Sequence, residues 1–243
     1  MKKNKKRLDI LVQEKYPHLS RNQVQSFILQ GKVKVDSKLE TKSGTPINID
    51  SDIILEVTEP KYVGRAGFKL EKALDHFNID VKDLIVLDAG ISTGGFTDCM
   101  LQRGVKKIYG VDVGYGQVHE KILKDKRLIL MERTNLRHLN SLPDIVDLVT
   151  LDLSFISILK VMPAVSKLIK PEGIIITLIK PQFEAERGQV GRGGIIKDEK
   201  VHEQVIEKIK NGMKEFGFNM VDLTDSPIFG AAGNKEFLAL FKK

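Results

Sequence analysis

The chain has 243 residues, enough for one or two domains with a buried core, and its 42% hydrophobic and 29% charged residues are typical of a globular protein. No apolar run is long enough to span a membrane, and no apolar signal-peptide segment follows the basic start Met1–Arg7. Cys99 is the only cysteine, which excludes an intramolecular disulfide and a cysteine-based zinc site, so we expect a cytoplasmic protein without a bound metal.

The positive charge is concentrated at the N-terminus. Residues 1–34 contain nine lysines and arginines against two acidic residues, so they account for the whole net charge of +7. Such a block indicates a polyanionic partner, because Lys and Arg contacts to phosphates supply most of the sequence-independent affinity for nucleic acid. The alternative is a solvated tail, which we prefer for Met1–Arg7 taken alone.

Two short amphipathic helices are expected within this block. Their apolar residues recur at helical spacing, with Leu8, Leu11 and Val12 in the first helix and Val24, Phe27 and Ile28 in the second. Ser20 and Gln23 have the spacing of a capping box at the start of the second helix. Gly31 is expected to end that helix.

Short strands are expected after the helices. Apolar runs bounded by turn residues lie at 32–35, 45–49 and 53–57. Residues 1–58 are therefore predicted to form a small α+β domain near the lower size limit for independent folding. The Pro-containing stretch 59–65 is the predicted linker to a second domain at 66–243.

The small domain resembles the S4 RNA-binding domain. The motifs that carry the resemblance are Arg7-Leu-Asp9, Ser20-Arg21 and Gln30-Gly-Lys-Val-Lys-Val35. In that family the two helices present basic side chains to structured RNA. The resemblance implies RNA contacts by these residues: Arg7, Ser20, Arg21, Gln23, Lys32 and Lys34. The alternative is a helix pair whose charges only face water.

From about residue 84 onward, strand-length apolar runs alternate with helical patterns. The runs are 84–88, 107–112, 127–131, 146–152 and 173–179. This alternation predicts a mostly parallel sheet that is covered by helices on both faces. Ligands of such sheets bind beyond the carboxyl ends of the strands, where the strand order reverses. We therefore expect the functional site at that edge.

A glycine-rich turn follows the first of these runs, in Asp88-Ala-Gly-Ile-Ser-Thr-Gly-Gly-Phe96. Its glycines permit a tight turn and a close approach to a ligand. Asp112 ends the second run, where an acid binds the ribose hydroxyls of nucleotide-type cofactors. The turn lacks the G-x-G-x-x-G pattern of a redox dinucleotide site, and no P-loop lysine follows it.

This arrangement resembles the S-adenosylmethionine site of class I, Rossmann-like methyltransferases. The resemblance implies a methionine-binding turn, a ribose contact by Asp112 and an adenine contact near the end of the third strand. The residues it assigns to the cofactor are Asp88, Gly90, Ser92, Thr93, Gly94, Gly95, Asp112, Asn135 and Asp152.

Four charged residues stand at the expected edge or beside it: Lys69, Asp152, Lys180 and Glu236. In this order they resemble the tetrad of FtsJ-type ribose 2′-O-methyltransferases, which implies a catalytic role for all four. A base methyltransferase would carry Pro-Pro-aromatic after the fourth strand, where this chain has Asp152-Leu-Ser-Phe155. We expect Lys180 to be the central group, either as a general base or as a stabiliser of the developing oxyanion.

Nearly the whole chain resembles the TlyA (hemolysin A) family. Motifs around Gly64, Asp88, Asp112, Asp152, Lys180 and Glu236 carry the resemblance in order, and only Ala66 and Phe68 depart from the family's usual residues. The family implies S-adenosylmethionine-dependent 2′-O-methylation of cytidine in rRNA of the small or large ribosomal subunit. Its members often bear a hemolysin name.

Two further segments lie near the C-terminal end. The basic, glycine-rich stretch Gly188–Gly194 follows Lys180 closely, so we expect Arg192 to contact RNA; a plain connector is the alternative. Apolar residues four apart in 201–213 predict a helix that packs on the core.

Two rival functions remain. One is a membrane-active toxin, for which no apolar segment of spanning length exists, and the other is an RNA-binding protein without catalysis.

Overall fold

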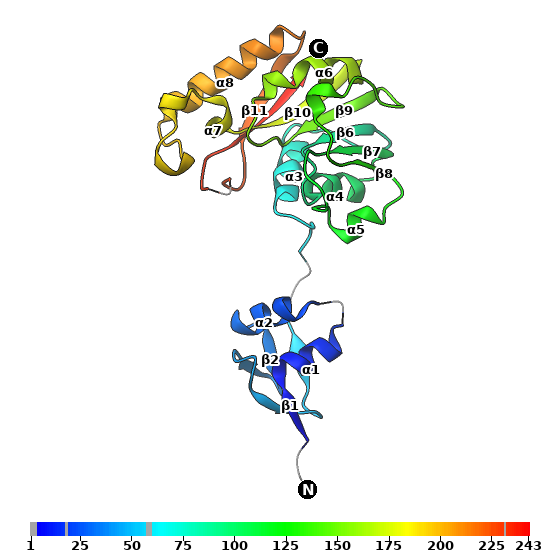
Figure 1. Cartoon of the computed structure of the whole chain (residues 1–243), viewed down its shortest axis with the longest axis vertical. Coiled ribbons are helices and arrows are strands. Elements are labelled where there is room, and N and C mark those ends of the chain that lie inside the picture. The colour runs from blue at the N-terminus through cyan, green and yellow to red at the C-terminus, as the bar shows by residue number, and fades with distance from the viewer. Residues whose placement is uncertain (1–3, 18, 57–59, 231) are drawn as a thin grey trace. The chain divides into compact units, whose positions relative to one another are not determined.

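The computed structural model describes residues 4–17, 19–56, 60–230 and 232–243. It divides the chain into two units, Met1–Lys61 and Tyr62–Lys243 (Figure 1). The division falls inside the predicted linker 59–65, but Tyr62 is buried in the core of the second unit. The Tyr62 ring packs edge-on against the Phe68 ring, with 5.2 Å between the ring centroids. Residues from 62 onward therefore belong to that unit and not to a linker.

Among its described residues, the first unit contains two helices and two small sheets. The helices are α1 (Leu8–Lys15) and α2 (Arg21–Leu29). The strands are β1 (Lys5–Arg7), β2 (Val33–Val35), β3 (Lys38–Glu40), β4 (Pro46–Asn48) and β5 (Ile53–Leu55). β1 pairs with β4, and β3, β2 and β5 form the other sheet. Both predicted helices and the three predicted strands are present, while β1 and β3 are additional.

A compact apolar cluster holds this unit together. It joins the inner faces of both helices to β2 and β5, through Leu8, Leu11, Val12, Val24, Ile28, Val33 and Ile53. Gly31 ends α2 with φ +68°, a left-handed conformation that glycine adopts without strain. The spacing predicts both helix faces correctly except for Phe27, which is half-buried and lies outside the cluster.

The second unit is built on a seven-stranded sheet with the order β11-β12-β10-β9-β6-β7-β8. The strands are β6 (Ile85–Ala89), β7 (Lys107–Val111), β8 (Leu128–Met131), β9 (Val146–Leu151), β10 (Ile169–Ile179), β11 (Asn219–Asp225) and β12 (Phe237–Lys242). β8, β7, β6, β9 and β10 are parallel, and β12 pairs antiparallel with both β10 and β11. The strand order reverses between β6 and β9. The prediction of an α/β, mostly parallel sheet is confirmed.

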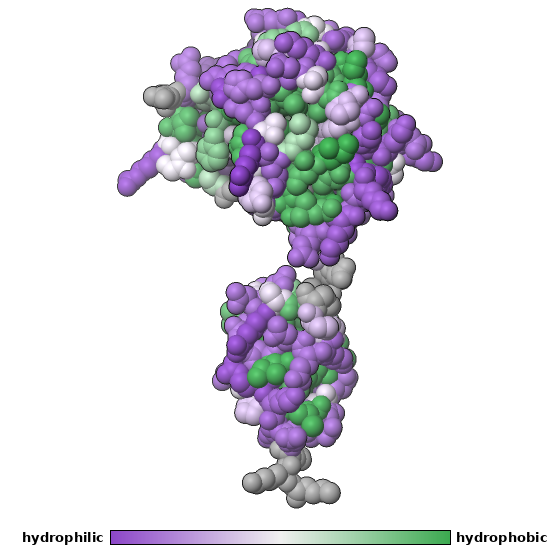
Figure 2. Space-filling model, turned by 45° about the vertical axis from the view of Figure 1, so that its right-hand side comes forward, coloured by the Kyte–Doolittle hydropathy of each residue, from purple (hydrophilic) through white to green (hydrophobic). Residues whose placement is uncertain are grey.

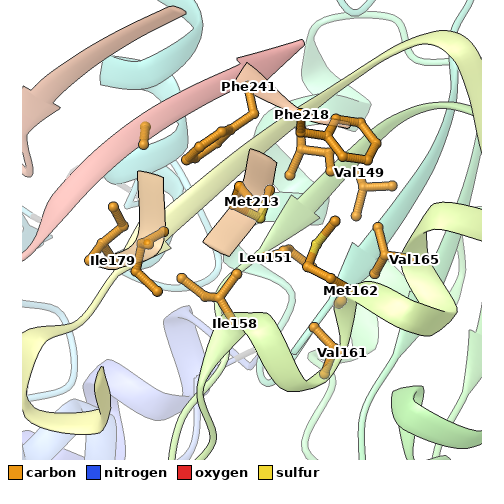
Figure 3. Close-up of a cluster of buried hydrophobic side chains, with 14 of the residues drawn as sticks. Val149, Leu151, Ile158, Val161, Met162, Val165, Ile179, Met213, Phe218 and Phe241 are labelled. Atoms are coloured by element: carbon orange, nitrogen blue, oxygen red, sulfur yellow. The ribbon is translucent and has the colours of Figure 1, made fainter. Parts of the chain in front are cut away.

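Helices cover both faces of this sheet (Figure 1). Their bounds are α3 (Ala66–His76), α4 (Gly95–Gln102), α5 (Glu120–Leu123), α6 (Met162–Leu168), α7 (Pro181–Glu184) and α8 (Glu199–Lys214). Short 3-10 turns lie at Leu136–His138 (η1), Ile158–Lys160 (η2), Arg187–Gln189 (η3) and Arg192–Gly194 (η4). One core packs α3 and α4 on the sheet, and the other packs α6 and α8 (Figure 3).

The apolar stripe of α8 lies in the core, as its spacing predicts. Val201, Val205, Ile209 and Met213 are all buried. β11, in contrast, has no counterpart in the sequence analysis. It is an edge strand with mostly exposed or half-buried residues, so it lacks the apolar pattern that identifies an inner strand.

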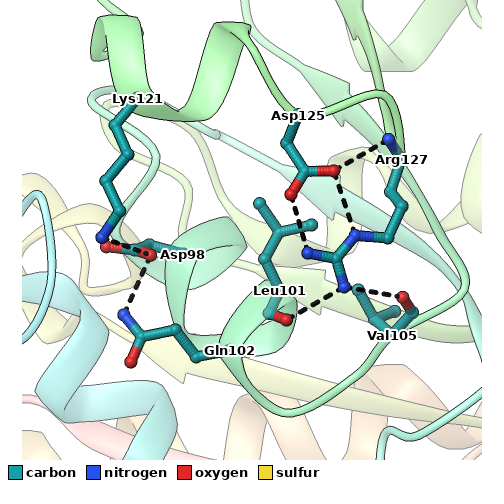
Figure 4. A network of polar contacts seen from close by, with 7 residues as sticks. All are labelled: Asp98, Leu101, Gln102, Val105, Lys121, Asp125 and Arg127. Atoms are coloured by element: carbon teal, nitrogen blue, oxygen red, sulfur yellow. Dashed lines mark hydrogen bonds and ion pairs between the residues drawn. The ribbon is translucent and has the colours of Figure 1, made fainter.

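Two polar networks fix α4, the helix that follows the glycine-rich turn (Figure 4). Asp98 is buried, accepts a hydrogen bond from Gln102 at 3.0 Å and pairs with Lys121 at 3.6 Å. It also accepts the Val63 amide at 2.8 Å. Near the other end of α4, the Arg127 guanidinium binds Asp125 and donates to the carbonyl of Leu101 at 3.0 Å. These contacts hold α4, which begins at Gly95 directly after the turn, against its neighbours.

Candidate active site

A pocket of about 510 Å³ lies at the carboxyl ends of β6, β7 and β9, where the strand order reverses. Its lining includes Gly90 and Ser92 after β6, Asp112 after β7, Asn135 before η1 and Asp152 after β9. These are five of the nine residues expected to bind a cofactor. Figure 2 shows that hydrophobic areas interrupt the hydrophilic surface of the second unit.

The glycine-rich turn approaches the β9 end closely. Gly90 has φ +86°, and a Cβ there would lie 2.6 Å from the backbone oxygen of Asp152. Gly94 has φ +94° and precedes α4, and a Cβ on Gly95 would lie 2.9 Å from the Gly67 amide of α3. Thr93, Gly94 and Gly95 do not line the pocket. Their cofactor contact stays a prediction, and in the structure the two glycines allow the turn and the packing of α4 on α3.

Asp112 is held by the backbone on both sides. Its Oδ2 accepts the Ser92 amide at 2.9 Å, and its Oδ1 accepts the Gly114 amide at 2.7 Å. A carboxylate offers about four lone pairs, so two amides leave acceptor capacity for the hydroxyls of a ligand. Asn135 uses its side-chain oxygen to cap η1 through the Arg137 amide at 3.1 Å.

Asp88 does not line the pocket, and its role as a cofactor ligand stays a prediction. Its side chain is fully buried, and it accepts the hydroxyls of Thr97 at 2.6 Å and Thr150 at 2.8 Å. Burial raises the pKa of Asp88 to about 6, with the nearby Asp152 and Asp112 carboxylates acting in the same direction. Asp88 therefore ties β6 to β9 and α4 behind the pocket.

Lys180 and Asp152 meet at the edge of the pocket. The Lys180 ammonium lies 2.7 Å from Asp152 Oδ1 and donates to the Ser154 hydroxyl at 3.0 Å. The two charged side chains are about nine-tenths buried, with 10% and 15% exposure. Parallel strands β10 and β9 are neighbours, so their carboxyl ends bring these residues together.

Lys69 and Glu236 form a second buried pair. Lys69 Nζ lies 2.5 Å from Glu236 Oε2, and both side chains are almost fully buried. A Cβ on Gly230 would lie 2.5 Å from Glu236 Oε1, so a side chain there would push the carboxylate from its present position. The register pairs Phe237 with Ile179, which sets Glu236 opposite Lys180 at the end of the β10–β12 ladder. The four tetrad residues thus gather at one edge of the sheet.

The loop that carries Arg192 is fastened to the loop before β12. Asn234 donates to the Gly194 carbonyl at 2.8 Å and accepts the Ile196 amide at 2.9 Å. Arg192 itself is exposed and does not line the pocket. The structure therefore leaves its side chain available on the surface, as an RNA contact requires.

The predicted RNA-binding arginines of the first unit converge on one acid. Asp9 is fully buried and accepts two hydrogen bonds from Arg7 at 2.9 Å and one from Arg21 at 3.4 Å. The Arg7 guanidinium is the main cause that holds the pKa of Asp9 well below its usual range. Arg7 and Arg21 remain about half exposed, so each can still face a partner.

The other predicted RNA contacts of this unit have different surroundings. Ser20 and Gln23 form the reciprocal capping box of α2, so their side chains serve the helix start. Lys34 pairs with Glu56 at 2.7 Å, and Lys32 is exposed. Lys2 and Lys3 of the basic block lie outside the described residues.

The pocket has further walls that the sequence analysis did not assign. They come from the loops after β7, β8 and β9: Val113, Gly114, Gln117, Leu136, Leu153, Ser154, Phe155 and Ile156. Thr134 also lines the pocket and lies in the segment expected near the adenine. Gly114, Gln117, Ser154 and Phe155 lie inside motifs that carry the family resemblance, which is the signal that could have identified them.

No cluster of three His, Cys, Asp or Glu suited to a metal occurs among the described residues. Within the same ranges, no helix is both long and apolar enough to cross a membrane.

Two family models match the chain. The model described as FtsJ-like methyltransferase matches residues 62–243, and the S4 domain model matches residues 6–54. The first match covers the whole second unit, including the pocket and the tetrad. The second lies within the first unit.

Individual relatives match over most of their length. The chain is 43% identical to hemolysin A of Brachyspira hyodysenteriae, over 97% of this chain and 99% of that protein. It is 38% identical to the 16S/23S rRNA (cytidine-2′-O)-methyltransferase TlyA of Mycobacterium tuberculosis, over 90% of this chain and 82% of that protein. A solved structure from Streptococcus thermophilus, described as a candidate hemolysin, superposes with a TM-score of 0.75 and 38% identity, covering 99% of this chain and 89% of that one.

These matches confirm the resemblance to the TlyA (hemolysin A) proteins. They extend over both units, and they agree with the sheet order and with the pocket at its carboxyl edge. The chain belongs to the FtsJ-like methyltransferase family and carries an S4 domain before its methyltransferase domain.

Proposed function

We propose that this protein methylates the ribose 2′-hydroxyl of a cytidine in ribosomal RNA, with S-adenosylmethionine as methyl donor. The observation that carries the proposal is the gathering of Lys180–Asp152 and Lys69–Glu236 at the sheet edge beside the pocket. A relative with 38% identity is named for this reaction.

The pocket fits the proposed cofactor. It is large enough for a nucleoside-sized ligand and combines the Asp112 carboxylate with apolar walls at Val111 and Leu136. Gly90 keeps the backbone free of a side chain where the β6 turn meets Asp152. We assign the ribose hydroxyls to Asp112, the adenine side to Asn135 and Leu136, and the methionine side to Gly90 and Ser92.

S-adenosylmethionine supplies an electrophilic methyl group when bound. The chain's own task is to align and activate the RNA hydroxyl, which is a weak nucleophile until its charge is stabilised or its proton removed. We assign this to the Lys180 ammonium, which Asp152 and Ser154 hold in place. Lys69 and Glu236 complete the charge arrangement and shape the site of the ribose.

RNA docking is assigned chiefly to the first unit. The basic residues of 1–34 provide phosphate contacts, with Arg7, Arg21 and Lys32 exposed or half exposed. Arg192 adds a contact from the methyltransferase domain. Ribosomal RNA or a ribosomal subunit is the proposed partner, and the basic S4 domain supports it.

The test is single-turnover methylation of rRNA, read by mass measurement of its nucleosides. Wild type should produce 2′-O-methylcytidine, and Lys180→Ala should slow the step by roughly 10²–10⁴-fold with little loss of RNA or cofactor binding. Lys180→Arg should not restore it, because a guanidinium does not deprotonate and has another shape. Lys214→Ala, an exposed lysine on α8, is the matched control. No methylated cytidine from wild type would refute the proposal.

A further inference from the structure

Two segments of the second unit are cross-linked along their length beside the pocket. One is 152–158, which follows β9, and the other is 180–184, which follows β10. At one end, the Lys180 ammonium lies 2.7 Å from Asp152 Oδ1 and donates a hydrogen bond to the Ser154 hydroxyl at 3.0 Å. In the middle, the ring centroids of Phe155 and Phe183 are 4.9 Å apart. At the other end, the Ile158 amide donates a hydrogen bond to Glu184 Oε1 at 2.7 Å. The first segment is therefore anchored to the second at both of its ends.

Glu184 forms the far anchor. Its side chain is 2% exposed, and its Oε1 accepts the amide hydrogen bond of Ile158, the first residue of η2. The backbone carbonyl of Glu184 accepts a hydrogen bond from the Lys208 ammonium of α8, with 2.5 Å between the two atoms. The acid is thus fixed by α8 on one side and holds the start of η2 on the other.

The anchored segment has a conformation that needs support. Residues 152–157 contain no helix or strand, and 152–156 line the pocket. Phe155 is 90% exposed and has φ +64°, which is unfavourable for a bulky residue. Such conformations persist only where the surrounding contacts determine them. Within the described residues, the side-chain links above tie this segment to 180–184.

We propose that Glu184 is a positioning residue for methyl transfer: by accepting the Ile158 amide, it fixes the pocket wall 152–156 and keeps Asp152 at the Lys180 ammonium. This proposal rests on the proposed function in one respect: the methylation rate is one of the two quantities that test it. Glu184 acts through Asp152 and Lys180 and needs no contact with substrate.

The role depends on the reach of the side chain and not on its charge. Burial raises the pKa of Glu184, although hydrogen bonds from Ser157 and Ile158 and the charges of two lysines act in the opposite direction. The Ile158 amide needs an acceptor oxygen at this distance, and a side-chain amide also offers one. Glu184→Gln keeps an oxygen at the same distance and loses the charge. Glu184→Asp keeps the charge but is one methylene shorter, so it cannot reach the Ile158 amide from the same backbone position.

The experiment compares these two variants with wild type and with Glu203→Gln, an exposed glutamate of α8. Single-turnover rates are measured at saturating rRNA and S-adenosylmethionine, below the thermal transition of every variant. Glu184→Gln should stay near the wild-type rate. Glu184→Asp should lose roughly 10- to 100-fold, the scale expected when reacting groups are misplaced by about 1 Å.

Amide hydrogen exchange, followed by mass spectrometry without RNA, is the second measurement. Exchange at 153–158 should become faster in Glu184→Asp and stay unchanged in Glu184→Gln and Glu203→Gln, while β10 keeps its protection. A wild-type rate in Glu184→Asp, an equal loss in Glu184→Gln, or a slow variant without faster exchange would each overturn the proposal. If wild type leaves rRNA unmodified, the proposed function fails and hydrogen exchange alone decides the role of Glu184.

Discussion

Lys69 reaches Glu236 across 167 residues of sequence, with 2.5 Å between Nζ and Oε2 and both side chains almost fully buried. One lies on α3, near the start of the methyltransferase domain, and the other immediately precedes the last strand, β12. Breaking such a pair leaves an uncompensated buried charge, whereas replacing both partners by apolar groups does not.

A double-mutant cycle tests this pair. Lys69→Met and Glu236→Leu should each lower the free energy of unfolding by about 3–5 kcal/mol, and the double variant should recover most of that loss. Denaturant unfolding measures the three differences. Methylation should be lost in all three variants. Additive losses in the double variant would show that the two charges do not compensate each other.

Asp112 is predicted to carry much of the cofactor affinity. Asp112→Ala removes the carboxylate that holds Ser92 and Gly114 and, as we propose, the ribose hydroxyls. S-adenosylmethionine binding should weaken by about 1.5–3 kcal/mol, the value of a hydrogen bond to a charged group. Calorimetry measures it, with circular dichroism as the control for folding. An unchanged dissociation constant in a folded variant would withdraw the assignment.

Asp88 should make stability depend on pH. Its folded pKa of about 6 lies above the ordinary value of 3.8, so between these pH values the folded state holds a proton that the unfolded state releases. Its stabilising contribution is therefore complete below pH 3.8 and is lost as pH rises through about 6. The unfolding free energy of Asp88→Asn, relative to wild type, should rise across this window and be level above it. A constant difference from pH 4 to 7 would contradict the raised pKa.

The basic N-terminal unit should control RNA affinity and its salt dependence. Deleting residues 1–57 removes most of the excess positive charge while leaving the methyltransferase domain whole. The truncated protein should bind rRNA more weakly, with a shallower dependence of log affinity on log salt, because fewer counterions are released. Cofactor affinity should be unchanged. Equal rRNA affinity with the same salt slope would assign docking to the second unit.

The apolar runs of the sequence predict the parallel strands β6, β7, β8, β9 and β10 within a few residues, because buried strands need continuous hydrophobic sequence. β11 was not predicted, because an edge strand with one exposed face has no continuous apolar run. The strands β1 and β3 were not predicted either, because Lys5–Arg7 and Lys38–Glu40 are mostly charged and exposed and contain no apolar run.

For the site, position along a strand is not enough to assign a role. Asp88 and Asp112 both stand at strand ends, yet only Asp112 lines the pocket, while Asp88 turns toward Thr97 and Thr150. Side-chain direction at a strand end depends on local twist and neighbours, which a single sequence does not specify. The pairing of Lys69 with Glu236 likewise depends on tertiary structure, and only the family resemblance suggested it.

The place of β12 in the sheet has a consequence for the assembly of the fold. The last strand of the chain is an inner strand, since β12 lies between β10 and β11. A nascent chain that ends before Phe237 can form the parallel half of the sheet, but β11 has no neighbour to pair with. Completion of the sheet and the placement of Glu236 beside Lys180 therefore both depend on β12. A variant that lacks Phe237–Lys242 should therefore lose the pairing of β11 as well as β12 itself.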